Sequence, residues 1–321
     1  MPAPGFVKRI GAVVDRRRGV EFQELRARSL VNRLNLPSMP FGWTINPFRG
    51  CEFGCRYCYA RPTHEYLGHA DPREFEERIY VKQAEPSRLL ADLKRARESG
   101  REIALGAATD PYQPAEGRFE VTRSVLRAIA RVAGLRVGLT TKSTLVTRDL
   151  DLLKEIAASS DLWVNFSVIS LDAALLRVIE PRAPRPDLRL GAMRTLAEAG
   201  LRTRLFAMPV LPLLTDSERA LRDLLRAAHE AGARETICQP LFLRTPSAHA
   251  FFFEFLGSEF PWAVRRYRAL YPAPGNAPRA YREMIEGRVQ RLARQAGFSA
   301  RSREERVRDE SPGRRQLSLV W

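Results

Sequence analysis

Asn46-Pro-Phe-Arg-Gly-Cys51-Glu-Phe-Gly-Cys55-Arg-Tyr-Cys58-Tyr-Ala-Arg61 is the stretch that says most about this chain of 321 residues. It holds three of the four cysteines, in the spacing C-x3-C-x2-C. Thiolates this close in sequence can bind one inorganic centre together. The iron–sulfur cubane of an electron carrier takes four cysteines, so three would leave one iron with an open coordination position. We therefore expect the chemistry of the protein at this loop.

The same cysteines have a second interpretation, a structural zinc site with His64 or His69 as the fourth ligand. Structural zinc is usually bound by two separated pairs of ligands, and this chain has one compact group of three. The sequence therefore favours an iron–sulfur cluster. The fourth cysteine, Cys238, lies among apolar residues of an expected strand. We expect it to be a buried, unreactive thiol.

The composition is that of a globular protein with a strongly basic balance of charge. Hydrophobic residues make up 45% of the chain, no apolar run is long enough to cross a bilayer, and the first residues lack the apolar stretch of a secretory signal. Clustered thiols without a disulfide framework fit a reducing compartment, so we expect a cytoplasmic protein with no membrane partner. The net charge of +16 indicates either a polyanion such as DNA or RNA or an arginine-rich, GC-biased composition.

From residue 41 onward, short apolar runs alternate with amphipathic stretches, which is typical of βα units on a parallel sheet. Strands are expected over residues 43–46, 102–107, 135–140, 162–168, 202–209 and 235–241. Helices are expected near residues 84–99, 119–133, 148–158, 186–199 and 216–231. Six strands are two fewer than a complete (β/α) barrel contains. The sequence therefore predicts an α/β fold, a partial (β/α)6 barrel of the TIM type.

Three segments follow from this pattern. Residues 1–40 are expected to form a basic, irregular arm, and residues 41–245 to form the barrel. Residues 246–321 are expected to be a helical extension, with helices near 247–256, 259–270 and 278–296 and a charged tail over 299–316. The aromatic run at 251–255 is expected to lie in the core and not to stack on bases.

The cysteine loop resembles that of the radical S-adenosylmethionine (radical SAM) enzymes, whose pattern is C-x3-C-x-aromatic-C. Cys51, Cys55, Tyr57 and Cys58 match it position by position. Within that superfamily the chain looks most like the spore photoproduct lyase-related branch and an uncharacterised bacterial group close to it. Further residues that carry this resemblance lie at 46–51, 59–66, 108–116, 141–143, 179–182 and 209–216.

The resemblance implies two cofactors, a [4Fe-4S] cluster on the three cysteines and S-adenosylmethionine (SAM). It also implies that the reduced cluster cleaves SAM to methionine and a 5′-deoxyadenosyl radical, which abstracts hydrogen from a substrate. An electron donor of the flavodoxin or ferredoxin type would supply the electron. The basic charge and the lyase-like branch together suggest a nucleic-acid base, in DNA or RNA, as the substrate.

Carried over by matching position, the resemblance assigns contacts with SAM to Tyr57, Thr109, Asp110, Lys142, Asn165 and Ser167. Tyr57 would line the adenine, Thr109 and Asp110 would bind the amino end, Lys142 would pair with the carboxylate, and Ser167 would bind the ribose. Simpler interpretations stay open. Lys142 can be a solvated cation, and Thr109-Asp110 can form a turn before Pro111.

Two other pairs have no preferred interpretation. His64 and Glu65 can orient the cluster loop or cap it, and Glu180 and Arg182 can form an ion pair or contact substrate. There is also one departure from the resemblance. Spore photoproduct lyase has a hydrogen-donating cysteine near the end of its second strand, whereas residues 106–110 contain none. Lyase activity on thymine dimers is therefore doubtful, and another donor, for which Tyr112 is the candidate, would be needed.

Two hypotheses follow, a radical SAM enzyme and a cluster- or zinc-stabilised nucleic-acid-binding module without turnover. The colour of the protein separates iron from zinc, because iron–thiolate charge transfer absorbs near about 400 nm. We expect anaerobically purified protein to be brown and to contain iron and sulfide. Colourless protein that contains zinc would contradict this expectation and favour the binding module.

Overall fold

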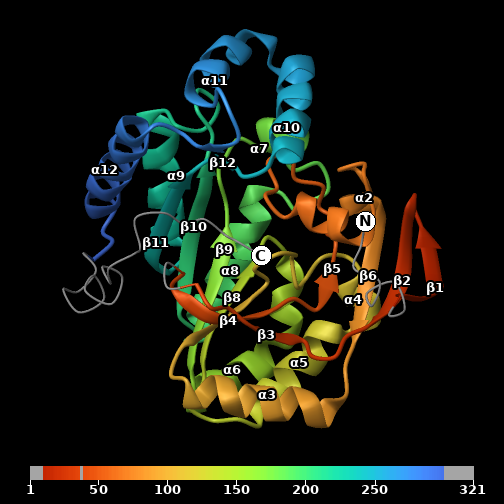
Figure 1. The fold of residues 1–321 in the computed structure, drawn as a ribbon. Helices are drawn as coiled ribbons and strands as arrows, with labels where there is room; N and C mark the ends of the chain where they lie inside the picture. The colour runs from red at the N-terminus through yellow and green to blue at the C-terminus, as the bar shows by residue number, and fades with distance from the viewer. Residues whose placement is uncertain (1–9, 37–38, 300–321) are drawn as a thin grey trace.

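The largest sheet of the molecule has seven strands in the order β11-β10-β9-β8-β7-β4-β3 (Figure 1). The computed structural model describes residues 10–36 and 39–299. The strands of this sheet are β3 (Val31–Arg33), β4 (Phe41–Ile45), β7 (Glu102–Leu105), β8 (Arg136–Thr141), β9 (Asp161–Ser167), β10 (Thr203–Val210) and β11 (Ala233–Pro240). All neighbours from β4 to β11 pair in parallel, and β3 pairs antiparallel to β4.

The six parallel strands are those predicted from the alternation of apolar and amphipathic runs, so the α/β class with a mainly parallel sheet is confirmed. The sheet is open, because β11 and β3 form its two edges and no pairing among the described residues joins them. A closed barrel is therefore absent from this part of the chain. Parallel strands bring all their carboxyl ends to one edge, where α/β folds place their functional groups.

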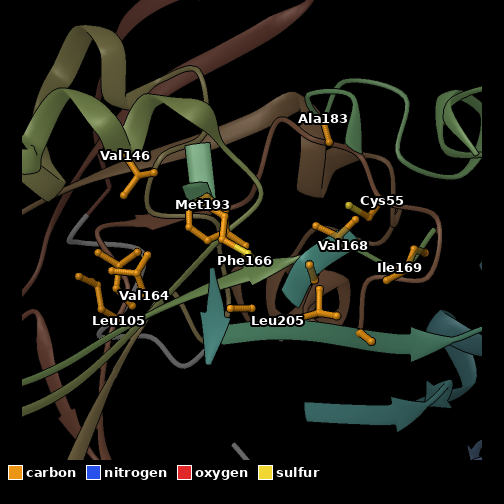
Figure 2. Packing of buried hydrophobic residues seen from close by; sticks show 14 of the residues in the cluster. Cys55, Leu105, Val146, Val164, Phe166, Val168, Ile169, Ala183, Met193 and Leu205 are labelled. Atoms are coloured by element: carbon orange, nitrogen blue, oxygen red, sulfur yellow. The ribbon is translucent and has the colours of Figure 1, made fainter. Parts of the chain in front are cut away.

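Helices cover one face of this sheet. They are α3 (Pro86–Glu98), α5 (Val121–Ala130), α6 (Leu150–Ser159), α8 (Pro186–Glu198) and α9 (Glu218–Glu230), close to the predicted ranges. Their apolar side chains share one core with alternate residues of the strands, such as Val164 and Leu205. Figure 2 shows part of this core, with Met193 of α8 beside Phe166 of β9.

The opposite face of the sheet carries polar and partly exposed side chains. On β9 the ring centre of Trp163 is close to two guanidinium groups, that of Arg202 at 4.9 Å and that of Arg204 at 3.9 Å. Arg204 in turn pairs with Glu235 of β11 at 2.8 Å. These charges lie toward the amino ends of the strands, opposite to the edge where the cysteine loop is attached.

A second sheet, in the order β1-β2-β6-β5, corrects the expectation of an irregular arm. Its strands are β1 (Ile10–Arg17), β2 (Val20–Arg26), β5 (Phe48–Arg49) and β6 (Arg78–Gln83). The arm looks irregular in sequence because much of β1 is exposed and charged, while the burial of Phe22 and Leu25 depends on β6, a strand that was not predicted. Residues 1–9 and 37–38 lie outside the described part of the chain.

The chain from residue 242 to residue 299 is mainly helical. It comprises β12 (Phe242–Leu243), α10 (Pro246–Glu259), η3 (Pro261–Ala263), α11 (Val264–Leu270), β13 (Gly275–Asn276) and α12 (Arg279–Gln295). Within the aromatic run, Phe251 and Phe252 are buried, as expected for core residues. Figure 1 shows α10 and α11 above the sheet and α12 beside α9. Apart from residue 299, the predicted charged tail lies outside the described residues.

Short elements complete the fold. They are η1 (Arg61–Leu67), α2 (Glu74–Glu77), α4 (Glu116–Phe119), η2 (Thr144–Asp149) and α7 (Ala173–Ile179). Among residues 10–36 and 39–299, no helix combines the length and the apolar character needed to cross a bilayer.

Leu205→Ala is expected to destabilise the protein by about 2–5 kcal/mol, because it opens a cavity in a closely packed core. Leu205 is 0% exposed on β10. The matched control is Leu188→Ala on α8, whose side chain is 52% exposed and whose loss should change stability by about 0.5 kcal/mol or less. Urea unfolding of both variants measures the difference, and equal losses would contradict this account of the core.

Candidate functional site

The cysteine loop follows β4 and β5 and leads into η1. Gly50 begins it with a left-handed φ of +89°, and a Cβ atom there would lie 2.7 Å from the carbonyl oxygen of Arg78 and 2.9 Å from that of Phe75. Only glycine fits such a close approach of two backbone segments. The N–H of Cys51 then donates to the Phe75 carbonyl at 2.9 Å. The loop is therefore fixed to α2 and β6 at its first cysteine.

Arg61 fixes the middle of the cysteine loop by binding the backbone at Cys55. Its side chain is 2% exposed, and its Nε and a terminal nitrogen donate to the Cys55 carbonyl at 3.2 and 3.0 Å. The guanidinium also pairs with the buried carboxylate of Glu76 and lies 4.3 Å from the ring centre of Phe251 on α10. A buried arginine with these partners is a structural clamp on the cysteine loop. Sequence reasoning missed it, because its acidic partner lies fifteen residues away.

Thr109 and Gln113 hold the first half of the loop from the end of β7. The Thr109 hydroxyl donates to the Gly50 carbonyl at 2.6 Å and accepts from the Gln113 amide at 3.0 Å. The Gln113 oxygen accepts the N–H of Glu52 at 2.9 Å. Thr109, predicted to contact SAM, is thus placed as an anchor of the loop. Gln113 was not predicted to have a functional role.

Asp110 fixes the end of β8 through hydrogen bonds to its carboxylate. One carboxylate oxygen accepts from the Thr141 hydroxyl at 2.7 Å and from the N–H of Tyr112 at 2.9 Å. The other accepts from the N–H of Lys142 at 2.7 Å. Asp110 therefore positions the backbone of Lys142, and its predicted direct contact with SAM stays a prediction.

Tyr57, Glu180 and Arg189 form a buried network on the other side of the loop. The Tyr57 hydroxyl donates to one oxygen of Glu180, and Arg189 pairs with the other. Arg189 also donates to the carbonyl oxygens of Pro184 at 2.7 Å and Ser167 at 3.0 Å. The partner of Glu180 is thus Arg189.

Arg182, the other partner considered for Glu180, is exposed. It donates to the carbonyl oxygens of Glu52 and Glu76, at 3.5 and 3.4 Å. Both carbonyls belong to segments next to the cysteines. Arg182 therefore supports the outer side of the loop and takes no part in the buried network.

Lys142 lies between these groups, with its ammonium 5.8 Å from the ring centre of Tyr57. Burial by itself lowers the pKa of Lys142, but the charges of Cys55 and Glu180 outweigh it and hold the pKa above its usual value. Burial likewise raises the pKa of Glu180, yet Arg189 and Lys142 bring it below its usual value. Lys142 and Glu180 are therefore both charged at neutral pH, as a cation suited to a carboxylate ligand requires.

The thiols of the loop influence one another. Burial raises the pKa of Cys55 to about 12, with Cys58 adding to the rise and Lys142 opposing it. Burial also raises the pKa of Cys51, where Asp110 and Cys55 add to the effect and the N–H groups of Phe53 and Asp110 oppose it. All three thiols are free. Binding of a metal centre must therefore displace protons, so it is favoured at higher pH.

The donor set fits an iron–sulfur cluster. Among the described residues, no three His, Cys, Asp or Glu side chains are grouped closely enough to share one metal ion. A cubane has no need of such a group, because each thiolate binds a different iron. A polar atom is also free nearby, since the Asn165 side-chain oxygen is buried without a hydrogen-bond partner, while its nitrogen donates to Thr140 at 3.2 Å.

Asn165 and Ser167 lie at the carboxyl end of β9, and both are buried. Tyr112 is placed differently. It is fully buried, and its hydroxyl donates to Asp149 at 3.0 Å, within a group that includes Arg123 and Arg148. This position gives no support to Tyr112 as a hydrogen donor, because the hydroxyl is already bound inside an ion-pair network.

The histidines considered as zinc ligands have other partners. His69 contacts Glu74 at 3.1 Å and the Tyr80 hydroxyl at 2.6 Å. His64 uses Nε2 to bind the Arg78 carbonyl at 2.9 Å, and burial lowers its pKa to about 3. Cys238 is partly buried on β11, and burial raises its pKa to about 12, as expected for an unreactive thiol.

Residues 45–225 match the sequence model of the radical SAM superfamily. An uncharacterised protein of Mycobacterium tuberculosis is 38% identical over 272 residues, which cover 84% of this chain and 79% of that protein. An uncharacterised protein of Methanocaldococcus jannaschii is 30% identical over 199 residues, covering 62% of this chain and 71% of that protein.

Among solved structures, spore photoproduct lyase complexed with dinucleoside spore photoproduct has a TM-score of 0.63 at 18% identity, covering 86% of this chain and 79% of that one. A double mutant of the same lyase, with bound AdoMet and the dinucleoside, has a TM-score of 0.61 at 17% identity, covering 86% and 82%. At these identities the likeness establishes a shared fold.

Gly50→Ala is expected to lower the iron and sulfide content per chain several-fold, because the new Cβ pushes the loop away from the carbonyl oxygens of Arg78 and Phe75. Gly19→Ala is the matched control. Gly19 is also left-handed, with φ +79°, but nothing lies within 4 Å of a Cβ there. Both variants carry the backbone strain of about 1–2 kcal/mol. Equal iron contents in the two variants would show that the close approach at Gly50 does not shape the loop.

Proposed function

Because this chain belongs to the radical SAM superfamily, we propose that it is an enzyme that cleaves SAM reductively and directs the resulting radical at a substrate hydrogen. The cofactors of the family are a [4Fe-4S] cluster and SAM. The observation that carries the proposal is the loop of Cys51, Cys55 and Cys58, anchored at the carboxyl edge of six parallel strands. We also infer that these strands form the partial (β/α)6 barrel of the family.

The cluster supplies one electron to the sulfonium of SAM when both are bound. The chain's own residues would hold, orient and shield them. The three thiolates would hold three irons and leave the fourth for SAM. The Lys142 ammonium is the cation available for the SAM carboxylate, and the free oxygen of Asn165 can accept from a ribose hydroxyl or an adenine amine.

Thr109 and Asp110 act, in this proposal, through what they position. Thr109 fixes the Gly50 carbonyl and Asp110 fixes the N–H of Lys142. Tyr57, with its hydroxyl on Glu180, has a fixed ring that can line the adenine. Ser167 at the end of β9 is proposed for the ribose. The carboxyl edge of the sheet thus carries the residues proposed to bind SAM, and another residue of the chain hydrogen-bonds to each of them.

We propose a nucleic-acid base as the substrate. The net charge of +16 favours a polyanionic partner, and spore photoproduct lyase, which has the same fold, was solved with a dinucleoside bound. An electron carrier of the flavodoxin or ferredoxin type is proposed as the source of the electron. Because Tyr112 is bound to Asp149, the hydrogen that returns to the product is proposed to come from another group.

The test is anaerobic reconstitution with iron, sulfide and dithionite, followed by detection of 5′-deoxyadenosine formed from SAM. We expect wild-type protein to form it and Cys55→Ala to form none. Cys238→Ala is the matched control, because Cys238 lies on β11 outside the loop, and we expect it to retain the activity. A wild-type protein that holds a full cluster and yields no 5′-deoxyadenosine would contradict the proposal. Salt-sensitive binding of DNA or RNA without SAM cleavage would favour the binding module instead.

A further inference from the structure

Glu180 and Arg189 form a fully buried ion pair against the cysteine loop, with exposed fractions of 1% and 0%. Every polar group of the pair has a partner, because Tyr57 binds the second oxygen of Glu180 and two carbonyl oxygens bind Arg189. Such a pair adds little net stability, since desolvation of two charges offsets their attraction, and apolar residues of similar volume serve as well. Its charges therefore call for an explanation other than stability.

The pair is fixed relative to Cys55 by two connections. The N–H of Arg56 donates to the carbonyl of Ile179, the residue before Glu180, at 2.9 Å, and Tyr57 binds the Glu180 carboxylate directly. Figure 2 shows Cys55 in the same core cluster as Val168 and Ala183. The Glu180 carboxylate and the Arg189 guanidinium are consequently held beside the loop at Cys55, together with the Lys142 ammonium, which lies 5.8 Å from the Tyr57 ring centre.

We propose that Glu180 is a positioning residue that acts through its fixed charge and keeps the cluster bound at Cys55 a strong reductant, with Lys142 acting in the opposite sense. This inference rests on the proposed function, because it requires an iron–sulfur cluster on the three cysteines. Reduction adds one electron, supplied by dithionite or an external carrier. A buried negative charge nearby makes that addition less favourable, and the local dielectric is low enough for the effect to be large.

Removing the charge of Glu180 and removing that of Lys142 should shift the midpoint potential of the cluster in opposite directions. Glu180→Gln keeps the size of the side chain and its hydrogen-bonding positions but removes the negative charge, which leaves Arg189 and Lys142 as two cations close to Cys55. We expect the midpoint potential of the cluster to rise. Lys142→Gln removes one cation, and we expect the potential to fall. Glu180→Asp keeps the charge and should stay close to wild type.

The measurement is a redox titration of each reconstituted protein without SAM, followed by the electron paramagnetic resonance signal of the reduced cluster. At a fixed potential we expect the ratio of reduced to oxidised cluster to be about tenfold higher in Glu180→Gln than in wild type, which corresponds to about 59 mV for one electron. Asp92→Asn is the matched control. Asp92 is also buried, but it lies in α3 and pairs with Arg88 and Arg95. Its loss should leave the potential unchanged.

A midpoint potential of Glu180→Gln equal to that of Asp92→Asn overturns the inference. If Glu180→Gln does not fold or take up iron, the midpoint potential of Lys142→Gln tests the inference instead. A potential in Lys142→Gln that is equal to or higher than that of wild type overturns the inference as well. A wild-type protein that assembles no cluster overturns the proposed function and this inference with it. Unshifted potentials in variants that do hold a cluster overturn this inference alone.

Discussion

The backbone of the cysteine loop is held from several directions at once, and the rest of the site depends on that constraint. Residues from α2, β6, η1, α7 and the segment after β7 all bind carbonyl or N–H groups of the loop. A loop without such partners samples many conformations and brings its cysteines together only at a cost in entropy. The surrounding elements meet that cost when the domain folds, so the backbone of the loop is ordered before any iron binds.

The fold could be predicted where the pattern was local. Each of the six parallel strands is a short apolar run followed by an amphipathic helix, and this signal survives without knowledge of the neighbours. β1 was missed because much of it is exposed and charged, and β2 because the burial of Phe22 and Leu25 comes from β6, more than fifty residues away along the chain. β6 itself, with Arg78, Tyr80 and Lys82 on alternate positions, does not look like a buried strand in sequence.

The site residues also divide into those with a local sequence signal and those whose role depends on distant partners. The three cysteines stand out because their spacing is itself the chemical requirement, whereas Lys142 was assigned through the family resemblance. Arg61 and Arg189 were not identified, because arginine is ordinarily exposed and each becomes buried only through one distant carboxylate. Thr109 and Asp110 were predicted to contact SAM. In the structure both bind protein groups beside the cysteine loop, and their contact with SAM stays a prediction. The position of a residue in a motif predicts that it belongs to a functional site, but its partners are seen only in the structure.

Phe251 on α10 lies over the guanidinium of Arg61, which in turn binds the Cys55 carbonyl. The helical extension is consequently part of the floor of the cofactor site and not a detachable accessory. Grafting the extension of a relative onto this core would succeed only if the graft supplied an aromatic ring at that place.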